Sequence, residues 1–202
     1  SKIGRSIMIE RNEEIRMENS FFAMLSRMKY IHRWGLMRNA RLENLSEHTL
    51  EVAYIAHALA LMSGIAPEKA VLCALYHDCT EIITGDMPTP IKYYNTEIRA
   101  IYGNIETAAQ ERLLETLPNH LRKEYAEMME PADPEIRRIV KAADKLSALI
   151  KCTEELRMGN RDFESARQAQ LEAIHAMDFP AAEEFLKEFM PAFDLTLDEM
   201  QK

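Results

Sequence analysis

Ala74-Leu75-Tyr76-His77-Asp78-Cys79-Thr80-Glu81 lies in an otherwise apolar run that opens at Pro67 and predicts a buried helix. A histidine beside an aspartate is unfavourable there, because burying an unpaired charge is costly and aspartate has weak helical propensity. At about 100° per residue, His77, Asp78 and Glu81 fall at roughly 0°, 100° and 40°, so one face would carry an imidazole and two carboxylates. Divalent cations bind such groups, and the pattern therefore predicts a metal site.

The composition predicts a single all-α domain. The chain has 202 residues, of which 47% are hydrophobic, and can bury one core. With 6 glycines, 13 methionines and long stretches of 3.6-residue periodicity, it offers little support for strands. The expected domain covers residues 19–202. Residues 1–18 are expected to be an N-terminal extension, either disordered or a frayed helix, with no function assigned.

Charge and hydropathy exclude some classes of partner. A formal net charge of -8 argues against binding of a nucleic-acid polymer, although it leaves a small anionic substrate open. No apolar run approaches the roughly 20 residues of a membrane span, and no signal peptide is visible, so no membrane partner is expected. The cysteines at 73, 79 and 152 lack paired spacing, which favours a reducing, cytoplasmic location.

Apolar periodicity and capping residues predict eight helices, and a stiff loop with two prolines is expected at residues 86–90. The expected helical ranges are 20–32, 44–64, 67–85, 95–117, 118–129, 134–159, 162–177 and 180–190. Asn44 or Ser46 is the expected cap of the second helix, and Asp133 is the expected cap before Pro134.

His48 is the natural third ligand of the predicted metal. It lies in the first turn of the expected helix 44–64, and consecutive helices usually pack as neighbours. The non-functional alternative for His48 is an exposed histidine near a helix N-terminus. The corresponding alternative for His77-Asp78 is an ordinary pair on the helix surface. His57 lies on the opposite side of the same helix, and His120 is the only histidine between Asp78 and Asp144, so a mononuclear centre is favoured.

Asp144 is the expected fourth ligand. Ile136, Val140 and Asp144 follow one another at a spacing of four, which puts the carboxylate at the edge of an apolar stripe. A buried carboxylate needs a partner, and the alternative to a cation is an arginine from another helix. Two histidines and two aspartates suit Mn²⁺, Co²⁺, Fe²⁺, Ni²⁺ or Zn²⁺, of which we expect one ion, with Co²⁺ or Mn²⁺ favoured.

Together these residues resemble the signature of a known family. The set His48, His77-Asp78 and Asp144 is similar to the H…HD…D signature of the HD-domain metal-dependent phosphohydrolases. Further motifs resemble the YfbR-type bacterial 5'-deoxynucleotidases, and this resemblance extends from about Asn19 to the C-terminus. These motifs are His32-Arg33-Trp34, Ser46-Glu47-His48, Tyr76 to Glu81, Gly85-Asp86-Met87-Pro88-Thr89-Pro90-Ile91-Lys92, Ala143-Asp144 and Lys151 to Leu156.

The resemblance implies an HD-domain helical bundle that removes the 5'-phosphate from deoxyribonucleoside 5'-monophosphates, with little base selectivity. It implies that Glu81 is a catalytic helper and that Asp86 is a second candidate for proton transfer. Arg33 would neutralise the phosphate, and Trp34 would exclude a 2'-hydroxyl unless it is simply core packing. The implied substrate-binding residues are Arg33, Trp34, Asp78, Asp86, Met87, Pro88 and Thr89. A homodimer is also implied.

Three other functions stay open at this stage. The chain could be another HD hydrolase, acting on nucleoside triphosphates, cyclic nucleotides or an alarmone, although no additional basic residues near the site support this. It could be an HD-fold oxygenase, but the histidines for a second metal are missing. It could also be a non-catalytic HD module, against which the retention of Glu81 argues. The C-terminal apolar residues, such as Phe185 and Phe189, could serve either a homodimer or the core.

Overall fold

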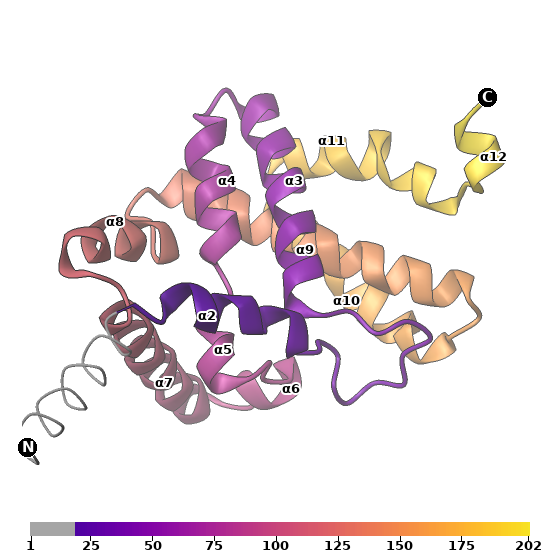
Figure 1. The fold of residues 1–202 in the computed structure, drawn as a ribbon. Helices are drawn as coiled ribbons and strands as arrows, with labels where there is room; N and C mark the ends of the chain where they lie inside the picture. The colour runs from indigo at the N-terminus through magenta and orange to yellow at the C-terminus, as the bar shows by residue number, and fades with distance from the viewer. Residues whose placement is uncertain (1–18) are drawn as a thin grey trace, which may run out of the picture.

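The computed structural model describes residues 19–202, which contain helices and one isolated antiparallel bridge between His32 and Asn44 (Figure 1). The all-α prediction is therefore confirmed for the described residues. The extension expected at residues 1–18 lies outside them. No helix in residues 19–202 is long and apolar enough to cross a membrane.

The helices vary widely in length. The α-helices are α2 (Phe21–Leu25), α3 (Leu45–Ser63), α4 (Pro67–Tyr76), α5 (Glu81–Thr84), α6 (Thr89–Lys92), α7 (Thr96–Glu115), α8 (Asn119–Met129), α9 (Pro134–Arg157), α10 (Glu164–His175), α11 (Pro180–Glu188) and α12 (Leu197–Met200). The 3-10 helices of the described residues are η1 (Ser26–Tyr30), η2 (Arg161–Phe163) and η3 (Met190–Asp194).

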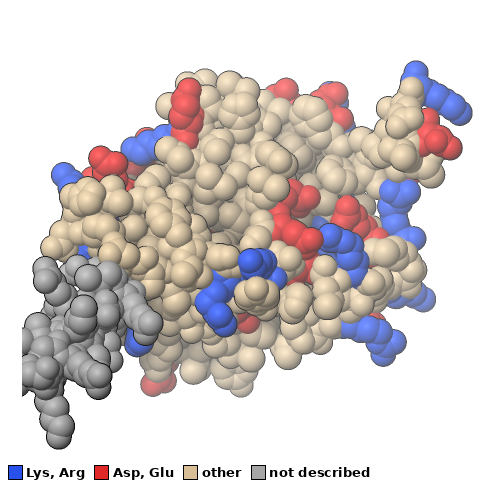
Figure 2. Space-filling model, in the orientation of Figure 1, with Lys and Arg blue, Asp and Glu red and all other residues tan. Residues whose placement is uncertain are grey.

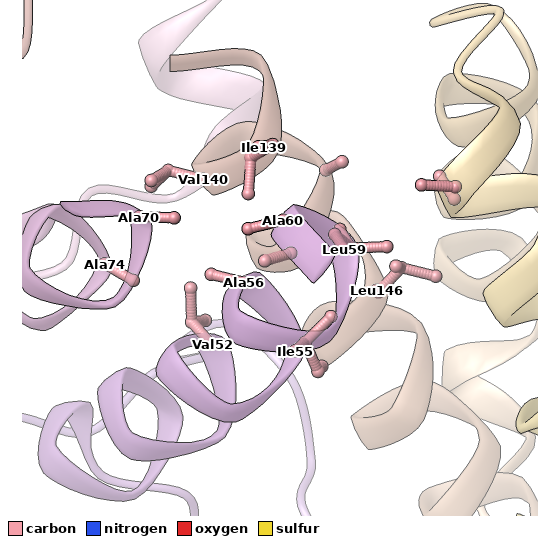
Figure 3. Packing of buried hydrophobic residues seen from close by; sticks show 14 of the residues in the cluster. Val52, Ile55, Ala56, Leu59, Ala60, Ala70, Ala74, Ile139, Val140 and Leu146 are labelled. Atoms are coloured by element: carbon pink, nitrogen blue, oxygen red, sulfur yellow. The ribbon is translucent and has the colours of Figure 1, made fainter. Parts of the chain in front are cut away.

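The core lies where α3 and α4 pack against α9 (Figures 1 and 3). Small residues line the contact between α3 and α4, so the two backbones can approach closely. They include Ala56 and Ala60 on α3 and Ala70 on α4. Larger side chains such as Leu59 and Leu146 fill the remaining space, and each fully buried one contributes roughly 1.5–3 kcal/mol. These three helices form the frame of the site described below.

Capping fixes the start of α3, and with it the position of His48. The Asn44 side chain accepts a hydrogen bond from the Glu47 N–H at 3.0 Å, and the Glu47 carboxylate accepts one from the Asn44 N–H at 3.1 Å. This reciprocal capping box satisfies two otherwise unpaired donors of the first turn. Asn44, one of the two expected caps, is thus the actual one. Asp133 also caps α9, as expected, with Pro134 in the first turn.

The first helix is shorter than predicted. It was expected to reach about His32, but α2 ends at Leu25 and continues as the 3-10 helix η1 to Tyr30. The cause is tertiary, because the next residues pair with the chain before α3 instead of continuing the helix. The Arg33 N–H donates to the Glu43 carbonyl at 3.0 Å, and the Leu45 N–H donates to the Ile31 carbonyl at 2.8 Å.

The helix expected over residues 67–85 is interrupted at the polar pair. The helix α4 ends at Tyr76, residues 77–80 form a turn, and α5 follows before Gly85, whose φ of +72° ends it. The prediction of one continuous helix was therefore wrong, and so was its placement of His77 and Asp78 on a regular helix face. Within the turn, Cys79 is fully buried in a second apolar cluster with Phe21 and Leu113, which anchors the break.

The C-terminal segments depart from the expected ranges in smaller ways. The helix expected over 162–177 is η2 followed by α10, and the one expected over 180–190 ends at Glu188. The residues after Pro88 form the short helix α6 where a loop was expected to reach Pro90. Phe185 belongs to the core, whereas Phe189 is 45% exposed. Of these two, only Phe189 leaves much of its ring available to a partner.

Candidate metal site

Four side chains converge where α3, α9 and the turn after α4 meet. His48 comes from the first turn of α3, His77 and Asp78 come from the turn, and Asp144 comes from α9. One potential ligand atom from each lies within 4.8 Å of all the others. His48 Nε2 is 3.0 Å from an Asp144 oxygen, and His77 Nε2 is 3.1 Å from an Asp78 oxygen. The structure therefore brings together all four residues expected to bind a metal.

Hydrogen bonds to the other ring nitrogens orient both imidazoles. His77 Nδ1 lies 2.7 Å from the Ala74 carbonyl, which can only accept, so this nitrogen carries the hydrogen. His48 Nδ1 lies 3.0 Å from the Ser147 hydroxyl oxygen. Both Nε2 atoms are buried without a hydrogen-bond partner among residues 19–202. Buried polar atoms normally have partners, and two imidazole nitrogens that face the same pair of carboxylates, Asp78 and Asp144, fit a shared cation.

The charges around this cluster also favour a cation. Burial lowers the pKa of His77, but the Asp78 and Asp144 carboxylates outweigh it and raise that pKa to about 9. Burial raises the pKa of Asp78, yet His77 and His48 hold it well below its ordinary value. Burial also raises the pKa of Asp144, and His48 outweighs this and lowers it, so both carboxylates stay ionised and attract positive charge. An arginine partner for Asp144 was the alternative, but its ion pairs are with the two histidines.

Glu81 is the residue that begins α5, directly after the turn. Its Oε2 is buried and has no hydrogen-bond partner in the described part of the chain. Burial, followed by repulsion from Asp78 and Asp86, raises the pKa of Glu81 to about 9. A carboxyl group with a raised pKa near the four-residue cluster is suited to exchanging a proton.

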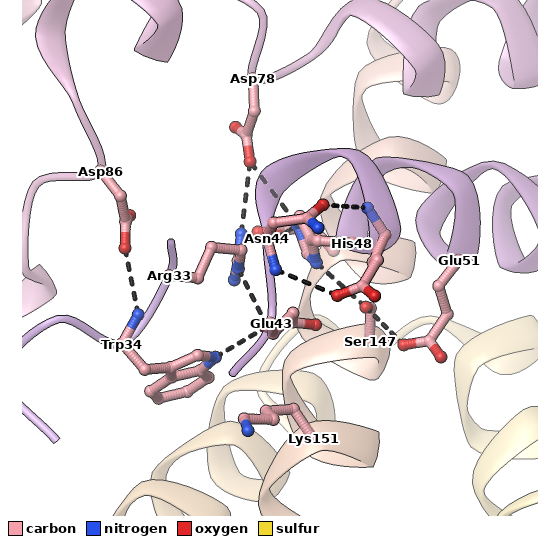
Figure 4. Close-up of polar contacts among 12 residues, drawn as sticks. Arg33, Trp34, Glu43, Asn44, His48, Glu51, Asp78, Asp86, Ser147 and Lys151 are labelled. Atoms are coloured by element: carbon pink, nitrogen blue, oxygen red, sulfur yellow. Dashed lines mark hydrogen bonds and ion pairs between the residues drawn. The ribbon is translucent and has the colours of Figure 1, made fainter. Parts of the chain in front are cut away.

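Arg33 lies between Asp78 and Glu43, and Trp34 contacts Glu43 and Asp86 (Figure 4). The Arg33 guanidinium is paired with Asp78 at 3.4 Å and with Glu43 at 3.3 Å. The Trp34 indole N–H donates to the Glu43 carboxylate at 3.0 Å, and its backbone N–H donates to Asp86 at 3.2 Å. The structure thus connects three predicted site residues, Arg33, Trp34 and Asp86, through carboxylates around the cluster.

Trp34 lies at the edge of the apolar core, and its contact with a sugar stays a prediction. Its side chain is half-buried and meets the fully buried Phe163 ring, with centroids 5.3 Å apart. Met87 and Pro88, also expected to bind substrate, lie between α5 and α6, and Thr89, expected to do the same, begins α6. The first two are half-buried and Thr89 is exposed. No hydrogen bond or ion pair joins these three to the four-residue cluster among residues 19–202, so their role stays a prediction.

Sequence reasoning missed several residues that support the site. Ser147 contacts His48 from α9, and Glu51 accepts a hydrogen bond from Ser147 at 2.6 Å. A helical signal could have found both, because Ser147 is three residues after Asp144 and Glu51 is three after His48. Glu43, which joins Arg33 to Trp34, had no such signal, because it lies in a connector.

The comparisons with known proteins agree with this geometry. The model of the family described as 5'-deoxynucleotidase YfbR-like matches residues 20–193. A protein of Vibrio cholerae named 5'-deoxynucleotidase is 45% identical over 191 residues, covering 91% of this chain and 98% of its own. One of Pectobacterium atrosepticum with the same name is 44% identical over 193 residues, covering 92% and 97%.

Solved structures share the fold. An HD-domain phosphohydrolase from Listeria innocua superposes with a TM-score of 0.75 at 23% identity, covering 91% of this chain and 92% of its own. A cyanophage S-2L HD phosphohydrolase, described as bound to dA and one catalytic Zn²⁺ ion, gives a TM-score of 0.67 at 23% identity, covering 86% and 96%. The expected HD-domain helical bundle is therefore confirmed.

Proposed function

The chain belongs to the YfbR-like 5'-deoxynucleotidase family, and on this basis we propose that it is a metal-dependent phosphoric monoester hydrolase. Its substrates are deoxyribonucleoside 5'-monophosphates, which it converts to deoxynucleoside and phosphate. The observation that supports this most is the convergence of two imidazole nitrogens and two carboxylates beside Arg33. The imidazoles and carboxylates can hold a divalent cation, and the Arg33 guanidinium can bind a phosphate.

The metal ligands in this proposal are His48, His77, Asp78 and Asp144. A single ion of Mn²⁺ or Co²⁺ is favoured, with Zn²⁺, Ni²⁺ and Fe²⁺ as further candidates for this mixed nitrogen and oxygen set. When bound, the cation would lower the pKa of a coordinated water and neutralise negative charge on the phosphate. The ion in the cyanophage structure is Zn²⁺, which suits the same donor types.

The protein side chains provide the remaining chemistry. The planar guanidinium of Arg33 binds the phosphate, with Asp78 and Glu43 holding its orientation. Glu81 orients the attacking water and takes its proton, a role that its buried, unpartnered oxygen supports. Asp86 is the second proton-transfer group, and burial raises its pKa as a proton donor requires.

In this proposal Trp34 and residues 86–89 select a deoxyribose over a ribose. The half-buried indole would pack against the sugar and leave no room for a 2'-hydroxyl. Asp86, Met87, Pro88 and Thr89 would close over sugar and phosphate. We propose broad tolerance for the base, because no side chain in residues 19–202 has been assigned to hydrogen-bond with the edge of a base.

The partner proposals are narrower. A nucleic-acid polymer is not a substrate in this proposal. Figure 2 supports this, because the basic side chains on the face it shows are interspersed with acidic ones.

A homodimer is proposed because large apolar side chains on α3 and α4 are exposed, among them Leu50, Tyr54, Leu61 and Leu72. Light scattering on the purified protein tests it. A cytoplasmic location is supported by three free, buried cysteines.

The test is phosphate release from dAMP and AMP by metal-stripped protein, with and without added Mn²⁺ or Co²⁺. Turnover of dAMP only, and only with metal, is the expected result. Equal turnover of AMP would reject the sugar selection while keeping the hydrolase. No turnover of either would reject the proposal in favour of another phosphorylated nucleotide or a binding module.

A further inference from the structure

Glu43 occupies a position in the site that the reaction chemistry alone does not explain. Its side chain is buried, 6% exposed, yet it is neither a member of the four-residue cluster nor directed into the apolar core. One of its oxygens, Oε2, lies 3.3 Å from the Arg33 guanidinium and accepts the Trp34 indole N–H at 3.0 Å. A buried carboxylate needs such partners, and here both belong to neighbouring site residues (Figure 4).

Trp34 requires this support because its backbone is strained. Its φ is +61°, a left-handed conformation that costs a bulky residue about 1–2 kcal/mol. Three contacts compensate: Asp86 accepts the backbone N–H, Phe163 packs against the ring, and Glu43 accepts the indole N–H. The hydrogen bond to Glu43 restrains the side-chain torsions of the indole, because it is the only polar contact that the ring makes among residues 19–202.

Glu43 is itself tied to the frame of the metal site. Its backbone carbonyl accepts the Arg33 N–H at 3.0 Å, and the next residue, Asn44, caps the helix that carries His48. Glu43 therefore connects three groups in one rigid unit: the helix with a metal ligand, the guanidinium and the indole.

We propose that Glu43 is a positioning residue that sets the sugar specificity of the site. By holding the Trp34 indole at a fixed place relative to the Arg33 guanidinium, it determines the gap available to the 2'-carbon of a nucleotide whose phosphate is bound. This proposal rests on the proposed 5'-deoxynucleotidase function. Without Glu43 the indole can rotate, and a ribonucleotide gains space.

The chain allows a direct test of the indole position that does not depend on activity. Trp34 is the only tryptophan, so its fluorescence reports on this ring alone. Glu43→Ala should make the fluorescence more readily quenched by acrylamide, and Glu43→Gln, which keeps an acceptor for the indole N–H, should not. Unchanged quenching in Glu43→Ala would overturn the proposed positioning even if the protein hydrolyses no nucleotide.

Kinetics then test the specificity. Glu43→Ala should lower the ratio of kcat/KM for dAMP over AMP by about tenfold or more, while Glu43→Gln should largely retain it. Trp34→Phe, which keeps a ring but lacks the N–H, should lower the same ratio. The double variant Glu43→Ala with Trp34→Phe should be no less selective than either single variant, because both remove one interaction.

Two controls separate positioning from general damage. Glu154→Ala removes an exposed carboxylate from α9 and should leave quenching and selectivity unchanged. Metal content and thermal midpoint identify variants that fail to fold, and if Glu43→Ala is one of them, Trp34→Phe decides the matter. Full retention of selectivity by Trp34→Phe, or effects of the two substitutions that multiply, would overturn the proposal. A wild-type protein inactive on dAMP would instead reject the proposed function.

Discussion

The Ser147 hydroxyl oxygen lies 3.0 Å from Nδ1 of the buried His48, and the other ring nitrogen, Nε2, faces Asp78 and Asp144. Ser147 donates its own hydrogen to Glu51 at 2.6 Å, so its oxygen is left to accept from His48. This direction of hydrogen bonding places the imidazole hydrogen on Nδ1 and the lone pair on Nε2, as a metal ligand requires.

Ser147→Ala is expected to lower metal affinity by roughly 10–100-fold, because His48 loses the group that fixes its tautomer. Calorimetric titration of metal-free protein with Mn²⁺ measures this. The ¹⁵N shifts of His48 in the metal-free protein should also change toward a mixture of tautomers. The matched control is Thr153→Val, which removes another buried hydroxyl from α9, one that donates to the Leu149 carbonyl and contacts no cluster residue among residues 19–202. Equal affinity losses in the two variants would contradict the prediction.

Glu81→Gln is expected to reduce kcat by roughly 10²–10⁴-fold while metal content and substrate binding stay close to wild type. The amide keeps the shape of the buried side chain but cannot take a proton. Steady-state kinetics with dAMP and metal analysis of the same sample measure both quantities. Activity within a fewfold of wild type would remove Glu81 from the proposed mechanism.

The strain at Trp34 predicts an unusual order of stabilities. Trp34→Gly should be more stable than Trp34→Ala by on the order of 1 kcal/mol, because only glycine adopts φ of +61° without cost. Both variants should admit AMP equally. Denaturant unfolding gives the stabilities, and the same pair of changes at exposed Leu36, where φ is not positive, should show the reverse order. A less stable Trp34→Gly would argue against backbone strain.

Glu155 fastens the connector before α3 to the end of α9, and this fastening should depend on pH. Burial raises the pKa of Glu155, but hydrogen bonds from Lys151, the Ala40 N–H and Asn160 outweigh it and lower the pKa to about 2. Because this folded-state value lies below the ordinary one, the carboxylate stabilises the fold above about pH 4.5, and the contribution is lost as pH falls toward 2.

Glu155→Gln should therefore cost roughly 3–5 kcal/mol of unfolding free energy at pH 7, since it leaves Lys151 buried without its partner charge. The difference from wild type should shrink as pH is lowered from 5 to 3. Denaturant unfolding at each pH measures it. Glu164→Gln, at an exposed ion pair with Arg161, serves as the control and should change little at any pH. A difference that is independent of pH would refute the argument.

The sequence predicted those parts of the molecule whose signals are local. Caps and apolar periodicity placed α3 and α9 close to their observed bounds, and the residue types at His48 and Asp144 indicated a shared cation before any geometry was available. The break after Tyr76 was not predictable in this way, because the apolar pattern continues through Ile82 and the anchor is the burial of Cys79 against α2 and α7. The support from Glu43 was equally hidden, since it depends on a bridge between segments.

The origin of the four cluster residues has a consequence for the life of the protein in a cell. His48 and Asp144 are separated by nearly half of the chain, and His77 and Asp78 lie at a break between two helices. A cation held by all four would act as a cross-link between three core segments, and its binding energy would add to the stability of the fold. The supply of metal would then govern how long the protein persists as well as how fast it works, because metal-starved chains would open and be degraded more readily.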